Sequence, residues 1–251
     1  MKKAFWKNAA LCAIGLAVIT VLWMIAYWTV GNDYIVPNLF LCLKAGVLLL
    51  GKGAFWAAVV SSLQRVLIAF LSSLVFAVML AIISYLYPSF RQIFAPIVGV
   101  LRALPVLGVL LLILNQTNSA VAPIIVAFLS LFPLLYTEIL SALLSVDKDL
   151  IEISNAYNVP LKKQITQLYL PMTLPHVLRS GGAALGFGVK LVISAEALVR
   201  TANSLGGQMQ DQQILNELPE LFALLIVSCL LAFVFETALI RLSVWTERRG
   251  K

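Results

Sequence analysis

The chain has 251 residues, of which 61% are hydrophobic and only 12% are charged, and its formal net charge is +7. A soluble domain carries about 25% charged residues, so this composition excludes an ordinary soluble enzyme or binding domain and indicates that lipid surrounds most of the chain. Apolar segments recur from residue 9 to residue 245 without a polar linker. This predicts a single all-α transmembrane domain over residues 1–251.

A helix needs about 20 apolar residues to cross a bilayer, and six segments meet this requirement. The first follows three lysines and superficially resembles a signal peptide, but its uncharged run is too long and no small-residue cleavage pattern follows it, so we expect a retained span. The polar turn from Asn115 to Asn118 divides one long uncharged run into two spans. The expected spans lie at residues 9–30, 58–86, 93–114, 119–144, 177–198 and 218–242.

Basic residues near the ends of spans favour the cytoplasmic side, and their distribution predicts the orientation of the chain. We expect both termini in the cytoplasm. The net positive charge then follows from topology, and no nucleic-acid partner is expected because no basic face is interleaved with stacking aromatic residues. This orientation puts Lys2, Lys3, Lys7, Arg91, Lys148, Lys162, Lys163, Arg241, Arg248, Arg249 and Lys251 inside, and Lys44, Lys52 and Arg200 outside.

Between the first two expected spans, residues 37–53 are apolar but too short to cross a membrane. We expect a helix that starts at Pro37 and lies along the outer interface. Gly46, Gly51 and Lys52 match most of the phosphate-loop pattern G-x-x-x-x-G-K-[ST], but Gly53 replaces the hydroxyl residue that would bind magnesium. Nucleotide chemistry is therefore expected on another chain.

The longest expected cytoplasmic connection, residues 145–175, has its own helical pattern. Asp149 and Glu152 are spaced as in a capping box, with Asp149 accepting from the first free amides and Glu152 reaching back. Asn158 is placed where a left-handed residue ends the helix, two residues before a proline. The pattern predicts a short helix, a turn and a second amphipathic helix that ends at residues 170–171. Such a rigid pair at the membrane surface is suited to docking.

This connection resembles the signature E-A-A-x(3)-G-x(9)-I-x-L-P of the permeases of binding-protein-dependent ABC importers. Every spacing fits, although both alanines and the glycine are replaced. Asn tolerates the backbone angles that glycine adopts at the turn. The flanking sequences are similar to the family patterns S-V-D-x-D-L, which includes Asp149, and L-P-x-x-L-P. The matching positions are Glu152, Ile153, Ser154, Asn158, Leu168, Leu170 and Pro171.

The resemblance extends more loosely from about residue 36 to residue 242, and within the family it is strongest to the branch that imports taurine, alkanesulfonates, nitrate, bicarbonate and thiamine precursors. It implies the type I ABC importer permease fold in a bacterial cytoplasmic (inner) membrane, with no catalytic residues on this chain. It also implies that ATP and magnesium are bound by an ATPase subunit, present in two copies, which docks on residues 147–171. The further partners implied are a second permease copy in a homodimer and an extracytoplasmic solute-binding protein.

The same resemblance implies that the permease moves a small, possibly anionic solute by alternating access. Glu152 then has two compatible roles, as a helix cap and as a direct contact to the ATPase. Lys162 and Lys163 are interpreted as a basic pair near lipid headgroups.

Ionisable groups within spans predict where the solute passes. Arg179, Lys190 and Glu196 interrupt the fifth expected span, and Gly182 and Gly186 in its first half allow close helix contact. Such a segment is stable at membrane depth only inside protein or beside water, so it is expected to line the pathway or the dimer interface. The candidate pathway residues are Glu138, Lys190 and Glu196. The alternative is structural ion pairs, for instance Glu138 with Lys190 or Arg65 with Glu196.

The polar segment 201–213 follows the fifth expected span. It is similar to the glycine turn and surface helix that close the outer side in this family, where the solute-binding protein would dock; an ordinary solvated loop is the alternative. No metal site is expected, because Cys12, Cys42, Cys229 and the single histidine, His176, lack ligand spacing.

Two other function classes stay open on sequence alone. A secondary transporter or channel would usually show internal repeats with paired broken helices, and only one span here is interrupted by glycines. A membrane-embedded enzyme acting on lipid would need a cluster of reactive side chains at the membrane surface, and the only dense charged segment, residues 147–152, is assigned to capping.

Overall fold

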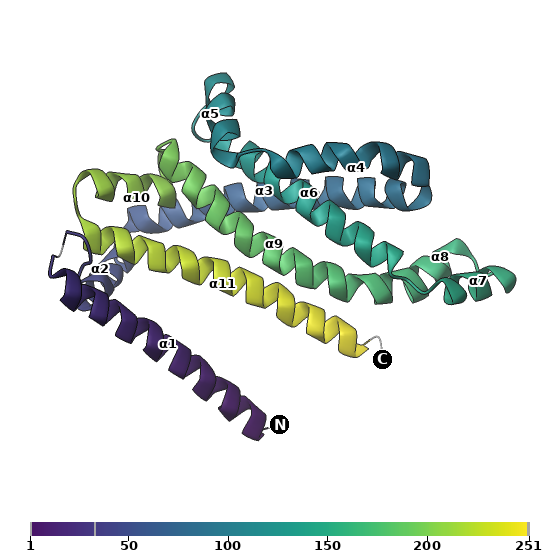
Figure 1. The fold of residues 1–251 in the computed structure, drawn as a ribbon, viewed down its shortest axis with the longest axis horizontal. Coiled ribbons are helices and arrows are strands. Elements are labelled where there is room, and N and C mark those ends of the chain that lie inside the picture. Colours follow the sequence, from purple (N-terminus) through teal and green to yellow (C-terminus); the bar gives the residue numbers. More distant parts are fainter. Residues whose placement is uncertain (1, 33, 250–251) are drawn as a thin grey trace.

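The computed structural model describes the backbone of residues 2–32 and 34–249, and the side chains of residues 14, 15, 17–32 and 34–246. Every regular element in these residues is a helix, which confirms the predicted all-α class. The helices form an elongated bundle (Figure 1). In chain order they are α1 (Lys2–Val30), α2 (Leu39–Leu50), α3 (Gly53–Leu86), α4 (Pro88–Ala103), α5 (Val106–Gln116), α6 (Ala122–Leu144), α7 (Lys148–Ala156), α8 (Leu161–Gln164), the π-helix η1 (Ile165–Tyr169), α9 (Leu170–Leu198), α10 (Leu205–Ile214) and α11 (Leu218–Arg249).

The long helices α3, α6, α9 and α11 make up the core of the bundle. α6 packs against both α3 and α9, and α11 packs along α9. Leu131, Leu135 and Val189 are buried where these helices meet. Many side chains on the outer surfaces of the same helices are apolar and exposed, as expected of a protein whose surroundings are lipid.

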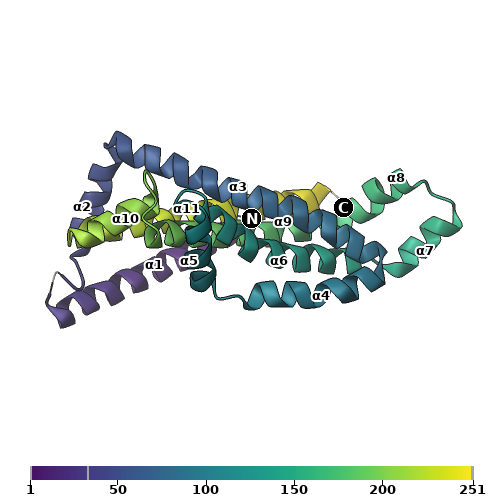
Figure 2. The ribbon, with the colours of Figure 1, turned by 90° about the horizontal axis from the view of Figure 1, so that it is seen from above.

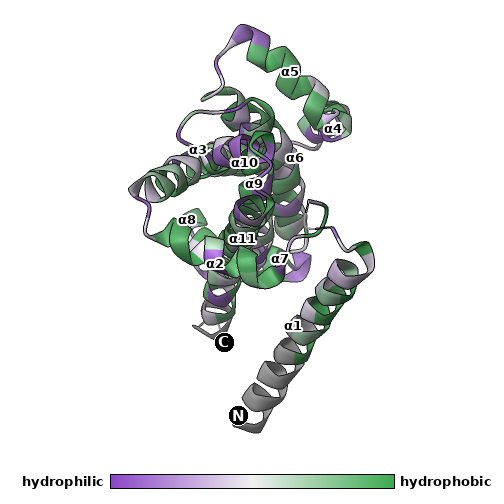
Figure 3. Cartoon of the chain, turned by 90° about the vertical axis from the view of Figure 1, so that its left-hand side faces the viewer, coloured by the Kyte–Doolittle hydropathy of each residue, from purple (hydrophilic) through white to green (hydrophobic). Residues whose placement is uncertain are grey.

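Four helical segments of the described part are long and apolar enough to cross a membrane: Gly53–Leu86, Ala122–Leu144, Leu161–Leu198 and Leu218–Thr246. They correspond to four of the six expected spans, although the helix expected at residues 119–144 begins at Ala122. A further expected span, residues 9–30, lies in α1, whose described apolar part, Ala17–Val30, is shorter than a span. α1 diverges from the bundle (Figure 3) and contacts it through Trp23, whose ring packs against Phe222 of α11.

The remaining expected span, residues 93–114, is bent. α4 and α5 meet at an angle of 91°, and Leu104 between them has an extended backbone with φ −63° and ψ 130°. The cause is Pro105, because a proline disfavours the helical conformation of the residue before it. The expected span is therefore a pair of helices that turns sharply.

α2 lies where a helix along the interface was expected, but it begins at Leu39 instead of Pro37, because the side chain of Asn38 caps it by accepting from the amide of Phe40 at 2.8 Å. Cys42, Ala45 and Leu49 form its buried face. Gly46 lies inside this helix, so the backbone there cannot wrap a phosphate. The phosphate-loop match is thus without structural support.

Each of the two opposite ends of the molecule carries a polar helix, α10 at one end and α7 at the other. α2 and α10 lie at one end, and α7 and α8 project from the other (Figures 1 and 2). The beginning of α1 and the end of α11 both point toward the α7 end (Figure 1). Both ends of the described chain therefore point the same way along the bundle, and their placement in the cytoplasm stays a prediction.

Candidate functional site

α7 and α8 form a projecting hairpin, and an aspartate starts its first helix. Asp147 has an extended backbone, and its carboxylate accepts the amide of Asp149 at 2.9 Å. The predicted cap, Asp149, is therefore wrong by two residues: Asp149 lies in the first turn, where its charge still favours the helix N-terminus. Glu152 is exposed on α7, which leaves its side chain available to a partner.

The turn of the hairpin is rigid. Asn158 has φ +50°, which confirms the predicted left-handed residue. The amide of Val159 donates to the carbonyl of Ser154 at 2.9 Å. Gln164 on the second helix donates its side-chain amide to Asn155 Oδ1 and to the Val159 carbonyl, both at 3.0 Å. The two short helices therefore hold a fixed geometry.

The second helix of the hairpin does not end at residues 170–171 as predicted. α8 passes through η1 directly into α9, and Leu170 and Pro171 lie in the first turn of α9. A proline ring normally clashes with the carbonyl four residues earlier. The wider π turn immediately before Pro171 gives that ring room, so the helix continues without a break.

The hairpin exposes several large apolar side chains among its polar ones. No residue of α7 is buried, and Ile153 and Tyr157 are 54% and 81% exposed. The spacing of Leu150, Ile153 and Tyr157 puts them on one face of α7, and Leu161 on α8 is exposed beside the turn. Of the other matched positions, Ser154 and Leu168 are half-buried, and Leu170 and Pro171 are exposed. We call residues 147–165 the docking hairpin.

A stripe of exposed side chains runs along α9 between α6 and α11. It comprises His176, Arg179, Ala183, Phe187 and Lys190, spaced three or four residues apart and therefore on one helix face. Two cavities open onto this α9 stripe. One of about 300 Å³ is lined by Glu138, His176 and Arg179, among others.

Glu138 and Lys190 do not pair. Glu138 Oε2 lies 3.3 Å from His176 Nε2, and within the described residues Lys190 has no ion pair. Lys190 instead lines a second cavity of about 460 Å³ between α9, α10 and α11, whose lining contains no carboxylate. Sequence reasoning had not linked His176 to Glu138, because the contact joins two helices whose facing sides periodicity does not define.

Glu196 lines neither of these cavities. Its side chain is completely buried, and its carboxylate lies 2.8 Å from Arg65 on α3. The ion pair considered as an alternative at this position is therefore present. Ser62 donates a hydrogen bond of 2.7 Å to the same carboxylate.

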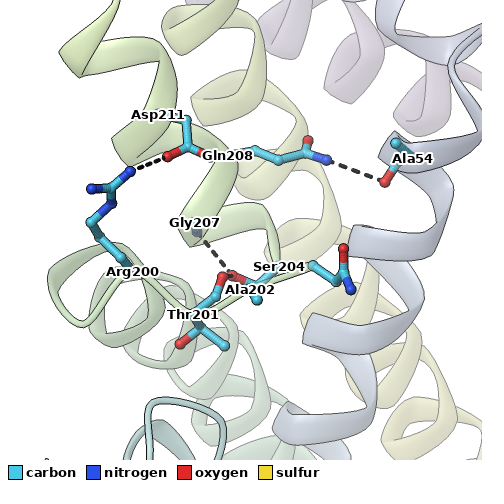
Figure 4. Close-up of a pocket in the computed structure, with 9 residues that line it drawn as sticks. Ala54, Arg200, Thr201, Ala202, Ser204, Gly207, Gln208 and Asp211 are labelled. Carbon is cyan, nitrogen blue, oxygen red and sulfur yellow. Dashed lines mark hydrogen bonds and ion pairs between the residues drawn. The ribbon is translucent and has the colours of Figure 1, made fainter.

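At the opposite end from the docking hairpin, the expected surface helix is present as α10. Ser204 caps it by accepting the amide of Gly207 at 2.9 Å. Beside it lies a polar cavity of about 550 Å³ (Figure 4), where Arg200 pairs with Asp211 at 2.8 Å and Gln208 donates to the carbonyl of Ala54. Arg200 and Asn203 in the loop before α10, and Asn216 in the loop after it, have positive φ; only the asparagines could have signalled this in the sequence.

The described residues contain no group of three or more His, Cys, Asp or Glu side chains arranged to hold a metal ion. Two of the cysteines, Cys42 and Cys229, are free thiols, and Cys12 lies outside the described side chains.

The sequence matches the family model described as binding-protein-dependent transport system inner membrane component over residues 73–249. Among similar proteins, a probable ABC transporter permease protein of Brucella abortus (strain 2308) is 26% identical over 249 residues, which cover 96% of this chain and 99% of the relative. The taurine transport system permease protein TauC of Escherichia coli (strain K12) is 25% identical over 235 residues, covering 89% of this chain and 84% of TauC.

Two solved structures show the same fold at low sequence identity. A bacterial alginate ABC transporter, in complex with its alginate pentasaccharide-bound periplasmic protein, gives a TM-score of 0.66 at 15% identity over 93% of this chain and 94% of that one. The MetNI methionine ABC transporter, in an inward-facing conformation, gives 0.61 at 20% identity over 80% and 97%. The fold is thus that of ABC importer permeases.

Proposed function

The chain belongs to the family of binding-protein-dependent transport system inner membrane components, and we propose that its docking hairpin is the part on which a separate ATPase acts. The protein is the permease subunit of an ABC importer, a translocation subunit without catalytic activity. This assignment replaces the alternatives of a secondary transporter, a channel and a lipid enzyme. ATP and Mg²⁺ would bind to the ATPase.

The observation that carries the proposal is a hairpin that projects from one end of the molecule (Figure 2) and exposes the apolar side chains of Ile153 and Tyr157 at its tip. Exposed apolar side chains on a polar end of a protein are typical of an interaction site. Tyr157 and Ile153 would enter a groove of the ATPase, and the exposed Glu152 would lie at the rim of that contact.

Continuity of the helix supports a mechanical role. Since α8, η1 and α9 form one helical rod from Leu161 to Leu198, a displacement of the docking hairpin by the ATPase would move α9 directly. The α9 stripe would then open alternately to the two sides of the membrane.

We further propose that the α9 stripe faces the solute path in an assembly of two permease copies, as a homodimer, with two ATPase subunits. An ionisable side chain at membrane depth is stable beside water or another protein surface, and Lys190 and Glu138 line cavities that such a path would join. They are the candidate solute contacts, and Glu196 is assigned to a buried cluster instead. A solute-binding protein would dock at the α10 end and deliver a small solute; taurine is the solute named for one relative.

The proposal can be tested by substituting two isoleucines that are equally exposed but lie at opposite ends of the molecule. Ile153 on α7 and Ile214 on α10 are both 54% exposed. Ile153→Glu buries a charge in the proposed contact, and we expect copurification of the ATPase to fall at least about tenfold, because an unpaired charge at an interface costs more than about 1.4 kcal/mol. Ile214→Glu should leave copurification unchanged. Equal ATPase binding by both variants would refute the proposal.

A further inference from the structure

A buried cluster joins the ends of α3, α9 and α10 that lie opposite the docking hairpin. The carboxylate of Glu196 on α9 pairs with Arg65 at 2.8 Å, accepts the hydroxyl of Ser62 at 2.7 Å and accepts the backbone amide of Gly206 at 3.3 Å. The Ser62 oxygen also accepts the backbone amide of Leu205 at 2.9 Å. We call this cluster the α10 clamp.

The clamp and the cap residue Ser204 together provide hydrogen-bond acceptors for the first three amides of α10. The first amides of a helix have no partner within the helix. In α10 the first three are accepted by side chains of three different segments: Leu205 by Ser62 of α3, Gly206 by Glu196 of α9, and Gly207 by the cap residue Ser204. The position of α10 is therefore set by α3 and α9, and not by its own loop alone.

Close backbone packing fixes α10 in the same place. A β-carbon at Gly206 would collide with the backbone of Ile193 and Ala197 and with Cβ of Glu196, all on α9, so the backbones of the two helices approach each other closely there. Thr201, in the loop between α9 and α10, donates to the carbonyl of Ser119 at 2.6 Å and links this loop to the turn that precedes α6.

The buried charges of the clamp oppose the loss of its interactions one at a time. Glu196 is fully buried and the Arg65 side chain is 12% exposed, so separating them would leave a charge in a place with little water. Within the described side chains, no buried polar atom lacks a partner. A network in which every member is satisfied is rigid.

We propose that the α10 clamp makes α10 and the adjoining ends of α3 and α9 one rigid unit, so that a movement of α9 reaches the polar surface of α10 undiminished. Ser62 and Glu196 are then positioning residues, which act by holding α10 and the cavity beside it (Figure 4). The inference rests on the proposed function for the source of the movement, but the rigidity of the unit is a property of this chain alone.

Two substitutions test the clamp without removing its buried charges. Ser62→Ala leaves the Leu205 amide without its acceptor, and Gly206→Ala forces α10 away from α9. The matched controls are Ser72→Ala, since Ser72 bonds only to carbonyls of its own helix, and Gly99→Ala, since Gly99 has free space around it. All four variants retain Arg65 and Glu196. Each should therefore assemble with the ATPase, and the basal ATP hydrolysis of the ATPase in these complexes should be unchanged.

The first measurement is hydrogen exchange of residues 205–214 in the assembled complex in lipid nanodiscs without nucleotide. We expect exchange about tenfold faster in Ser62→Ala and Gly206→Ala, because a buried amide has lost its partner, and unchanged exchange in both controls. Equal exchange in all four proteins would overturn the inference. This outcome is independent of whether the ATPase acts through the docking hairpin.

The second measurement distinguishes transmission from mere stability. Spin labels at Ala57 on α3 and Ile214 on α10 report their separation in complexes that carry one doubly labelled copy, with the native cysteines replaced by alanine. The parent protein should show one narrow distance, the same without nucleotide and with ATP and vanadate, and Ser62→Ala should broaden it in both states. A distance in the parent that changes with nucleotide would contradict a rigid unit.

Discussion

At the scale of single residues, the Arg65–Glu196 pair is a buried ion pair that is costly to break. Its members lie 2.8 Å apart, with the carboxylate fully buried. The pair gains little over a well-packed apolar core, but removing one partner strands a buried charge. Arg200 and Asp211 have the same separation but are both more than half exposed, so solvent screens their interaction.

This contrast gives a prediction for stability. Arg65→Met should lower the free energy of unfolding by about 3–5 kcal/mol, whereas Arg200→Met should lower it by less than about 1 kcal/mol. Thermal unfolding of the purified variants in one detergent checks both values. Losses of similar size in the two variants would show that Glu196 is not buried as described.

Single residues also show how far sequence reasoning reaches. Asn158 was predicted correctly, because asparagine two residues before a proline is a local signal for a left-handed turn. The helix cap was assigned to Asp149 instead of Asp147, because two aspartates stood close enough to the helix start to serve. The partner of Glu138 could not be found at all, since the contact to His176 depends on how α6 and α9 are rotated against each other.

At the scale of elements, the contact of α9 with α11 depends on small residues. A β-carbon at Gly182 would lie 3.0 Å from the backbone oxygen of Glu236 and 3.2 Å from Leu239 Cβ. Backbone atoms cannot move aside as a flexible side chain can, so any larger residue must push the two helices apart.

Substitution of Gly182 therefore separates the helices. Gly182→Leu should destabilise the protein by about 1–3 kcal/mol or more, seen as a lower unfolding temperature. Gly99→Leu is the control, since Gly99 on α4 has nothing within 4 Å, and it should leave the unfolding temperature nearly unchanged. Equal shifts would mean that α9 and α11 do not pack as closely as the structure has them.

Elements that are long and apolar were predictable, because a lipid-facing helix needs only length and composition to be recognised. The bend between α4 and α5 was missed because an uncharged run continues through Leu104 and Pro105, and hydrophobicity alone carries no information on helix direction. The continuity of α8 with α9 was missed for the opposite reason: Pro171 suggested a helix end, and the π turn that accommodates it has no sequence signal.

At the scale of the whole molecule, one helical rod joins the two polar ends. The docking hairpin continues through η1 into α9 (Figure 1). The α9 stripe includes Lys190, one of the two proposed solute contacts, and the α10 clamp links the far end of α9 to α10. A displacement of the hairpin can thus be transmitted to the opposite end of the molecule through a continuous helix. Which faces meet other subunits could not be derived from the pattern of one chain.

The central claim is that the docking hairpin meets the ATPase, and site-specific photocrosslinking tests it most directly. A photoreactive amino acid would replace Tyr157, which is 81% exposed at the tip of the hairpin, or Leu215, which is 66% exposed beside α10, in cells that produce the complete importer. We expect the Tyr157 position to crosslink to the ATPase and the Leu215 position not to. An ATPase crosslink from Leu215, or none from Tyr157, would contradict the account.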